Sequence, residues 1–168
     1  EDIAKIDEIL SIRYTTSHPL DMDLELIKAH KNVDKLMPYL HLPIQSGSDN
    51  ILKKMNRRHT ASQYLKIIEL VRKYCEDIAI SSDFIVGHPG ETNEDHKKTL
   101  DIINEVQFAS SYSFMYSERP GTKSSEFGEI VDKNIKKIRL HQIQNKLNDY
   151  QLTFNKNMEG LEFPILIT

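Results

Sequence analysis

The segment from Ile78 to Thr92 carries the side chains with the clearest chemical potential. Its first nine residues are rich in β-branched and apolar types, which favour a strand. Alternate side chains of a strand point to opposite faces. One face is bulky and apolar, whereas the other carries Ala79, Ser81, Asp83, Ile85 and Gly87. Because a carboxylate inside a sheet is costly unless it is hydrogen-bonded, this small and polar face predicts the wall of an enclosed ligand site.

Three groups of residues suggest binding chemistry, and each also has an ordinary structural reading. Asp83 could accept two ribose hydroxyls, or be a buried carboxylate satisfied within the fold. The Gln45–Ser48 turn could bind an anion through its backbone N–H groups, although a plain turn with a serine cap is favoured locally. The run Arg57–His59 could bind a carboxylate or phosphate, or place cations at a helix C-terminus.

Metal and nucleophile chemistry have weaker support. The seven histidines include no pair with i, i+4 spacing, which disfavours a helical zinc site. A single cysteine, Cys75, excludes an internal disulfide and any multi-cysteine metal site within this chain. It is expected to be a core residue rather than a nucleophile. Cations on the last long helix predict a solvated face rather than an RNA-binding one; they include Lys133, Lys136, Lys137, Arg139 and Lys146.

Helical and strand patterns alternate along the chain. Strands are expected at 12–16, 39–44, 78–86 and 112–116, and a further strand begins at 161. Helices are expected at 1–10, 23–30, 48–55, 60–74, 92–106 and 133–158, with capping boxes at Thr60/Gln63 and Thr92/Asp95. Such alternation predicts an α/β fold with parallel strands joined by right-handed crossovers.

Side-chain alternation favours a barrel wall over an open sheet. The strand at 39–44 has one partly polar face, and the strand at 112–116 has a small one carrying Ser111 and Ser113. Both are expected to line a cavity together with Asp83. The chemistry should lie at the C-terminal strand ends, where Gln45, Gly87 and Ser117 fall.

Composition fits a globular protein of one domain. The chain has 168 residues, 39% hydrophobic and 28% charged, and a formal net charge of −3. This balance gives no general electrostatic case for nucleic-acid binding. No apolar run approaches the roughly 20 residues of a membrane span, so no membrane partner is expected.

Five motifs, in this order, resemble those of the radical S-adenosylmethionine (SAM) methylthiotransferase family. They are Tyr14–Pro19, His41–Ser48, Met55–Thr60, Ser82–Thr92 and Tyr116–Thr122. The resemblance covers Arg13 to about Gly160. The sequences of the motifs are most similar to those of the bacterial branch that modifies tRNA adenosine. They are less similar to those of the branches acting on a ribosomal protein or on threonylcarbamoyl-adenosine.

The resemblance implies a fold and a set of cofactor contacts. Residues 1–160 would form the C-terminal part of a partial (β/α) TIM-like barrel, and residues 161–168 the start of an RNA-binding (TRAM) β domain. Gln45 and Asp83 would hold the ribose hydroxyls of SAM. Arg57 would bind its carboxylate, with Arg58 as the alternative, and Ile85 would pack on the adenine.

The implied reaction adds a methylthio group to C2 of N6-isopentenyladenosine next to the anticodon of tRNA. It would use SAM, [4Fe–4S] clusters and an electron-donor protein, in the cytoplasm. The family's three-cysteine cluster loop and three further cysteines are missing from this sequence. We therefore expect the chain to be the later part of a longer protein and to be inactive alone.

Three alternatives stay open at the level of sequence. One keeps the chemistry but modifies a ribosomal-protein side chain. Another is a non-catalytic RNA-binding module that uses the basic helix. The last is a phosphate-binding barrel enzyme that uses the Gly87–Gly90 loop.

Overall fold

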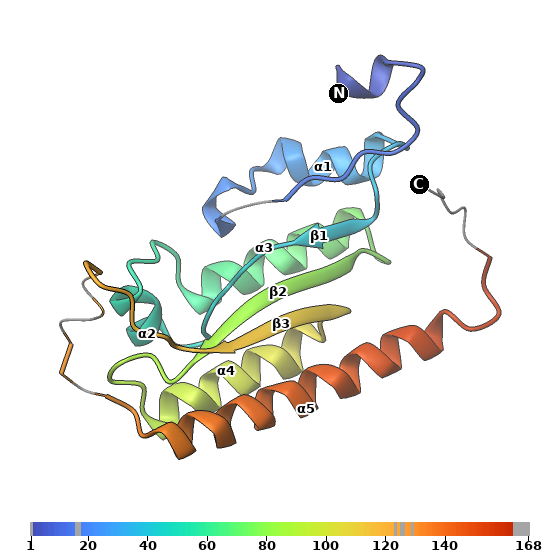
Figure 1. Cartoon of the computed structure of the whole chain (residues 1–168). Helices are drawn as coiled ribbons and strands as arrows, with labels where there is room; N and C mark the ends of the chain where they lie inside the picture. The colour runs from blue at the N-terminus through green and yellow to red at the C-terminus, as the bar shows by residue number, and fades with distance from the viewer. Residues whose placement is uncertain (1, 16–17, 123, 125–126, 129, 163–168) are drawn as a thin grey trace.

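Three parallel strands form the centre of the protein. The computed structural model describes residues 2–15, 18–122, 124, 127–128 and 130–162. The strands β1 (Tyr39–His41), β2 (Ala79–Val86) and β3 (Ser110–Met115) pair in the order β1-β2-β3. This α/β arrangement confirms the predicted parallel pairing (Figure 1).

The helices begin at side-chain caps that the sequence largely reveals. Thr60 with Gln63 and Thr92 with Asp95 form the predicted capping boxes, and Asp23 caps the first helix. The five helices are α1 (Leu24–Asn32), α2 (Asp49–Lys54), α3 (Ala61–Tyr74), α4 (Asn93–Val106) and α5 (Lys133–Asn157), with 3₁₀ turns at Ile3–Lys5 and Pro19–Asp21. None of these described helices is both long and apolar enough to cross a membrane.

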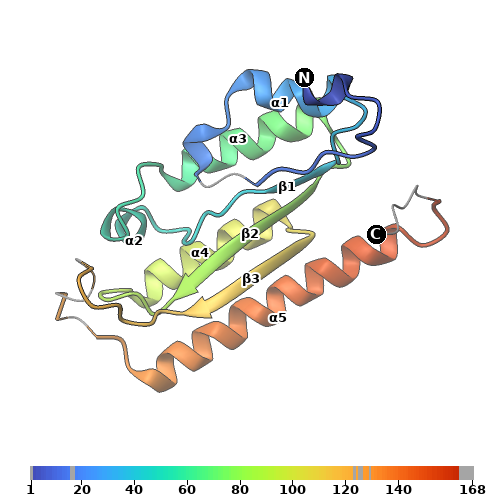
Figure 2. The same cartoon turned by 45° about the horizontal axis from the view of Figure 1, so that its top comes forward.

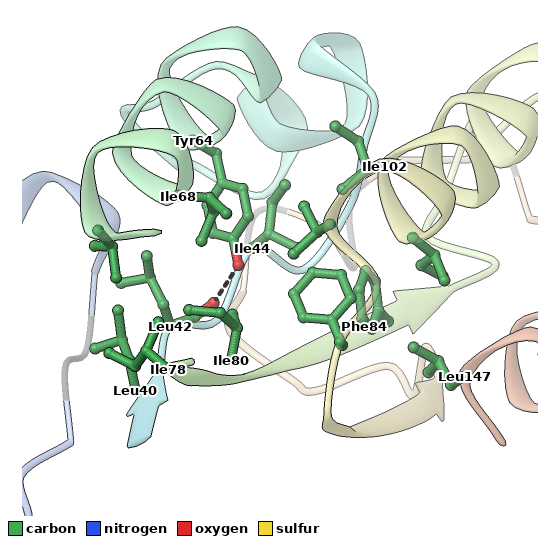
Figure 3. Packing of buried hydrophobic residues seen from close by; sticks show 14 of the residues in the cluster. Leu40, Leu42, Ile44, Tyr64, Ile68, Ile78, Ile80, Phe84, Ile102 and Leu147 are labelled. Atoms are coloured by element: carbon green, nitrogen blue, oxygen red, sulfur yellow. Dashed lines mark hydrogen bonds between the residues drawn. The ribbon is translucent and has the colours of Figure 1, made fainter. Parts of the chain in front are cut away.

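The core lies between one face of the sheet and the helices α3, α4 and α5 (Figures 1 and 2). Phe84 of β2 is fully buried there and meets Phe108 edge-on, with ring centroids 5.3 Å apart. The hydroxyl of Tyr64 on α3 donates to the Leu42 carbonyl oxygen at 3.0 Å, so that its ring can be buried without an unpaired polar atom (Figure 3). Packing of this one face leaves the opposite face available to ligands.

The predicted elements at the N-terminus are wrong. Of the expected helix at 1–10, the described residues 2–10 give only one 3₁₀ turn, and Ile3, Ile6 and Leu10 are exposed. Their spacing suits a helix, but in the described chain the segment has no apolar surface to pack against, and packing supplies most helical stability. Instead of the strand at 12–16, isolated parallel bridges join Ile12 to Leu36 and Thr15 to His41. Residue 16, like the tail beyond 162, lies outside the described residues.

The expected faces of the last strand are also wrong. In β3, Phe114 lies beside Ile85 and Tyr112 beside Asp83, whereas Ser113 lies beside Phe84. Neighbours in a parallel sheet share a face, so the aromatic side chains flank Asp83, whereas Ser111 and Ser113 face the helices. The reason is that α5 packs closely along β3, and small side chains permit that approach.

The Gln45–Ser48 turn is packed against α4 and is not an open anion site. The N–H of Gly47 donates to the Thr99 hydroxyl at 3.0 Å, and the N–H of Ser48 donates to the Ser46 hydroxyl at 3.2 Å. The Ser48 hydroxyl in turn donates to Asp95 at 2.5 Å. These groups are buried and already paired, so the structural reading of this turn is the correct one.

Replacing Gly47 by alanine should destabilise the fold. A Cβ at position 47 would lie 2.4 Å from the backbone oxygen of Lys98 and 2.7 Å from the Cα of Thr99. Because backbone cannot move aside as a flexible side chain can, we expect a loss of about 1–3 kcal/mol in the free energy of unfolding. Urea denaturation followed by circular dichroism would measure it.

Gly128→Ala is the matched control, since a Cβ there meets nothing within 4 Å. Its unfolding free energy should be unchanged or slightly raised. Equal stabilities for the two alanine variants would contradict the close approach of the turn to α4.

Candidate functional site

A cavity of about 740 Å³ opens at the C-terminal ends of the strands. All four residues singled out for cofactor binding, Gln45, Arg57, Asp83 and Ile85, line it. The other lining residues come from the C-cap of α2, the loop after β2, and the end of β3 with the loop that follows; they are Met55, His88, Phe114, Met115, Tyr116, Ser117, Arg119, Thr122 and Ser124. The structure thus brings together side chains from four separate stretches of the chain.

Gln45 has an unusual backbone that β2 holds in place. Its φ is 75°, a left-handed value that is uncommon for residues other than glycine. Its N–H donates to the Asp83 carbonyl at 2.9 Å, and its own carbonyl accepts from the Ile85 N–H at 3.0 Å. Two backbone bonds therefore fix a strained residue at the cavity, and strain of this kind is concentrated at functional sites.

Asp83 belongs to a polar group on the open face of the sheet. The His41 Nε2 lies 3.5 Å from its Oδ2, and the His41 Nδ1 is 3.0 Å from the Ser81 hydroxyl oxygen. The carboxylate still has 27% of its side chain exposed toward the cavity. Asp83 is consequently oriented by its neighbours without being closed off from a ligand.

Arg57, rather than Arg58, reaches the cavity. Burial lowers the pKa of the Arg57 guanidinium, and the nearby Asp83 carboxylate opposes that change. Arg58 is exposed and does not line the cavity. The site therefore pairs a carboxylate with a partly desolvated guanidinium, and such a guanidinium suits a ligand carboxylate or phosphate.

A buried ion pair anchors the loop that follows β2. Arg139 donates to the Glu91 carboxylate at 2.7 Å and to the Glu91 backbone oxygen at 3.0 Å, and also to the Asn93 side chain at 2.9 Å. The same Glu91 carboxylate accepts from the Gly87 N–H at 2.8 Å. Burial raises the pKa of Glu91, while these two donors oppose that rise. Helix α5 is thus joined directly to the rim of the cavity.

Two findings correct the prediction that the cations of α5 form a solvated face. Arg139 is only 5% exposed, because it serves the Glu91 pair. Lys136 covers Gly87 and lies over the Tyr116 ring, with its Nζ 5.3 Å from the ring centroid. The Gly87 N–H already donates to the Glu91 carboxylate, which weighs against phosphate binding by the Gly87–Gly90 loop.

The sequence predicted that the strand at 112–116 and Ser117 border the cavity, and Ser117 does line it, but the parts played by Tyr116, Phe114 and His88 were missed. Tyr116 and His88 meet there edge-on, with ring centroids 5.1 Å apart, and the His88 Nε2 is 3.0 Å from the Ser124 hydroxyl oxygen. Burial lowers the pKa of His88. The strand-end position of Tyr116 was the available signal, but the wrong face assignment for β3 concealed the role of Phe114.

The residues present do not fit an iron–sulfur cluster. Cys75 is the single cysteine of the sequence and caps the end of α3, where burial raises its thiol pKa. In the described part of the chain, no three His, Cys, Asp or Glu side chains are grouped to hold a metal ion. A cluster in the intact protein would need ligands from outside this sequence.

Comparison with known proteins identifies relatives for this arrangement. The family model of the Radical SAM superfamily matches residues 1–103. Proteins named tRNA-2-methylthio-N(6)-dimethylallyladenosine synthase are 54% identical in Ehrlichia chaffeensis, over 98% of this chain, and 52% identical in Bartonella tribocorum, also over 98%. The chain spans only 37% and 36% of the lengths of these two relatives.

Removing Arg139 should destabilise the protein strongly. Arg139→Met would leave the Glu91 carboxylate buried without its partner, which typically costs about 3–5 kcal/mol. Chemical denaturation should show this loss, whereas Lys137→Met, on the exposed side of α5, should change little. Adding Glu91→Gln to Arg139→Met should recover part of the loss, and no recovery would contradict the ion-pair explanation.

Stability should fall in mild acid because of His59. Burial, followed by the neighbouring His18 and Arg57, lowers the pKa of His59 to about 4 from an ordinary value of 6.5. Between these two pKa values, His59 is protonated in the unfolded chain but not in the folded protein. The free energy of unfolding therefore decreases as the pH falls from about 6.5 to about 4.

The His59 contribution should reach at most about 3 kcal/mol. Unfolding free energies measured between pH 7.5 and 4.5 should depend less on pH in His59→Asn than in the parent. His141→Asn, at an exposed histidine, should keep the parental dependence. Parallel curves for parent and His59→Asn would refute this assignment.

Proposed function

The chain belongs to the radical SAM superfamily, and we propose that its strand-end cavity binds S-adenosylmethionine as part of a tRNA methylthiotransferase. The observation that carries the proposal is the convergence of Gln45, Arg57, Asp83 and Ile85 on one cavity of about 740 Å³. This volume lies within the range of about 300–1,000 Å³ that is usual for small-molecule sites. In this proposal the sheet and its helices form the C-terminal part of a (β/α) barrel.

The donor set complements the parts of S-adenosylmethionine. Asp83 and Gln45 supply acceptors for the two ribose hydroxyls, and the Arg57 guanidinium suits the methionyl carboxylate. Ile85, on the same face of β2 as Asp83, offers an apolar surface for the adenine. Bound in the intact enzyme, the cofactor supplies radical chemistry and the methyl group. This chain's residues bind and orient it beside a cluster held elsewhere in the protein.

The proposed substrate is N6-isopentenyladenosine next to the anticodon, which would gain a methylthio group at C2. The names of the relatives support this choice over a ribosomal-protein side chain. The burial of Arg139 weakens the case for a separate RNA-binding module built on α5. A cytoplasmic location and an electron-donor protein partner belong to the same proposal.

Asp83→Asn in the full-length enzyme carrying this segment should weaken binding of S-adenosylmethionine. Loss of a charged acceptor for two hydroxyls is worth about 1.5–3 kcal/mol, or roughly 10–150-fold in the dissociation constant. Equilibrium dialysis with labelled cofactor would measure it, with Asp101→Asn on the exposed side of α4 as the control. An unchanged dissociation constant would remove Asp83 from the site.

The activity itself can be tested by complementation. A bacterium lacking its own methylthiotransferase should regain the methylthio mark in its tRNA when supplied with the full-length gene. Mass analysis of tRNA nucleosides reads the mark directly. Failure of the parent gene to restore it, with the protein present and its clusters loaded, would reject this function.

A further inference from the structure

A row of aromatic side chains, here called the aromatic wall, lies beside the proposed cofactor residues and has no part in the proposed cofactor binding. Tyr112 and Phe114 lie on the open face of β3, next to Asp83 and Ile85 in the register of the sheet. Their exposed fractions are 63% and 54%, although the matching side chains on the other face of β2 are buried. Large aromatic side chains grouped on one exposed face generally mark a binding surface.

The wall continues into the cavity and acquires a positive charge. Phe114, Tyr116 and Arg119 all line the cavity. Arg119 is exposed and forms no ion pair with any residue that the structure describes. The Tyr116 hydroxyl is buried and has no hydrogen-bond partner within the described residues. An aromatic face therefore meets, at one side of the cavity, a guanidinium without an ion-pair partner and a hydroxyl without a hydrogen-bond partner among the described residues.

This combination suits a single unstacked nucleotide. Proteins that bind single-stranded nucleic acid place bases on aromatic rings and meet the phosphates with arginine, and each stacked base contributes about 1–3 kcal/mol. Enzymes that modify a base must also take it out of its stack before they can reach it. A tyrosine hydroxyl adds a hydrogen bond to a base edge or a sugar.

We propose that Phe114, Tyr116 and Arg119 form a nucleotide subsite that receives the unstacked adenine of the RNA substrate. This inference rests on the proposed function and adds where the substrate base binds. Phe114 provides the stacking surface, Arg119 contacts a neighbouring phosphate, and Tyr116 contacts the nucleotide through its hydroxyl.

The register explains how this subsite would adjoin the cofactor. Adjacent strands lie about 4.8 Å apart, so groups resting on Ile85 and Phe114 are neighbours. In this proposal Gln45, Arg57 and the β2 residues serve the cofactor, whereas Phe114 of β3 and the two residues beyond that strand serve the base. One cavity would thus hold, side by side, the two ligands that must react with each other.

The test compares RNA and cofactor binding by the full-length enzyme with its clusters loaded. Phe114→Leu keeps an apolar side chain without the ring, whereas Phe114→Tyr keeps the ring. Fluorescence anisotropy would measure binding of an anticodon stem-loop that carries isopentenyladenosine. We expect about a tenfold weaker dissociation constant for Phe114→Leu, near-parental affinity for Phe114→Tyr, and cofactor affinity unchanged within about twofold.

A stem-loop that lacks the target base tests whether Phe114 acts by stacking on that base. The parent should bind this abasic stem-loop about as weakly as Phe114→Leu binds the intact one, and combining the two losses should add little. Arg119→Gln should weaken RNA binding and reduce its salt dependence, because one phosphate contact is lost. The control Ile138→Ala removes a similarly exposed side chain (58%) from α5 and should leave both affinities unchanged.

Several outcomes would overturn the subsite. Parallel loss of cofactor and RNA affinity in Phe114→Leu would mean that the wall holds the cofactor. A lower thermal midpoint with unchanged RNA affinity would mean that another part of the protein covers the wall. If the parent binds no RNA, the proposed function fails with it; if the parent binds RNA but Phe114→Leu binds equally well, only the subsite fails.

Discussion

The pairing of β2 with a neighbour on each side is the interaction on which the rest of this structure depends. β2 forms the middle of the sheet. Beyond the end of β1, its backbone also bonds to the backbone N–H and the backbone carbonyl of Gln45. Its core face is filled by Phe84 and its neighbours, which commits α3, α4 and α5 to that side. The opposite face then carries the polar and aromatic groups, and the cavity forms where the strands end.

The buried polar groups of this protein connect the helical layer to the cavity. Asp95 joins the first turn of α4 to the Gln45–Ser48 turn through Ser48. Glu91 joins α5 to the start of the Gly87–Gly90 loop through Arg139 and the Gly87 N–H. Since each carboxylate already has donors, burying it costs less than burying it alone. Both arrangements stiffen a loop that borders the cavity, so the rigidity of the site comes from residues that do not line it.

Local sequence signals predicted well wherever a short-range interaction decides the outcome. The capping boxes of α3 and α4 depend on residues three apart, and the helical pattern of α5 and the alternating pattern of β2 can each be read within one segment. The first ten residues failed because their helical spacing needs a partner surface, which the described chain does not offer. In β3 the alternation of serines and aromatics was plain, but which set faces the helices depends on where α5 packs. The same holds for Arg139, whose burial requires Glu91 from a segment almost fifty residues away.

The sequence by itself determined the alternating α/β pattern and the polar face of β2, and its family motifs pointed to four cofactor residues, with Arg57 ahead of Arg58. Tertiary structure decided that those four line one cavity, that Arg58 does not, and that Phe114 and Arg119 complete its far side. The physical reason is that side-chain type and spacing determine only which chemical groups a segment carries and on which face of its own helix or strand they lie. Strand register and helix packing join segments distant along the chain, and they alone set which faces meet.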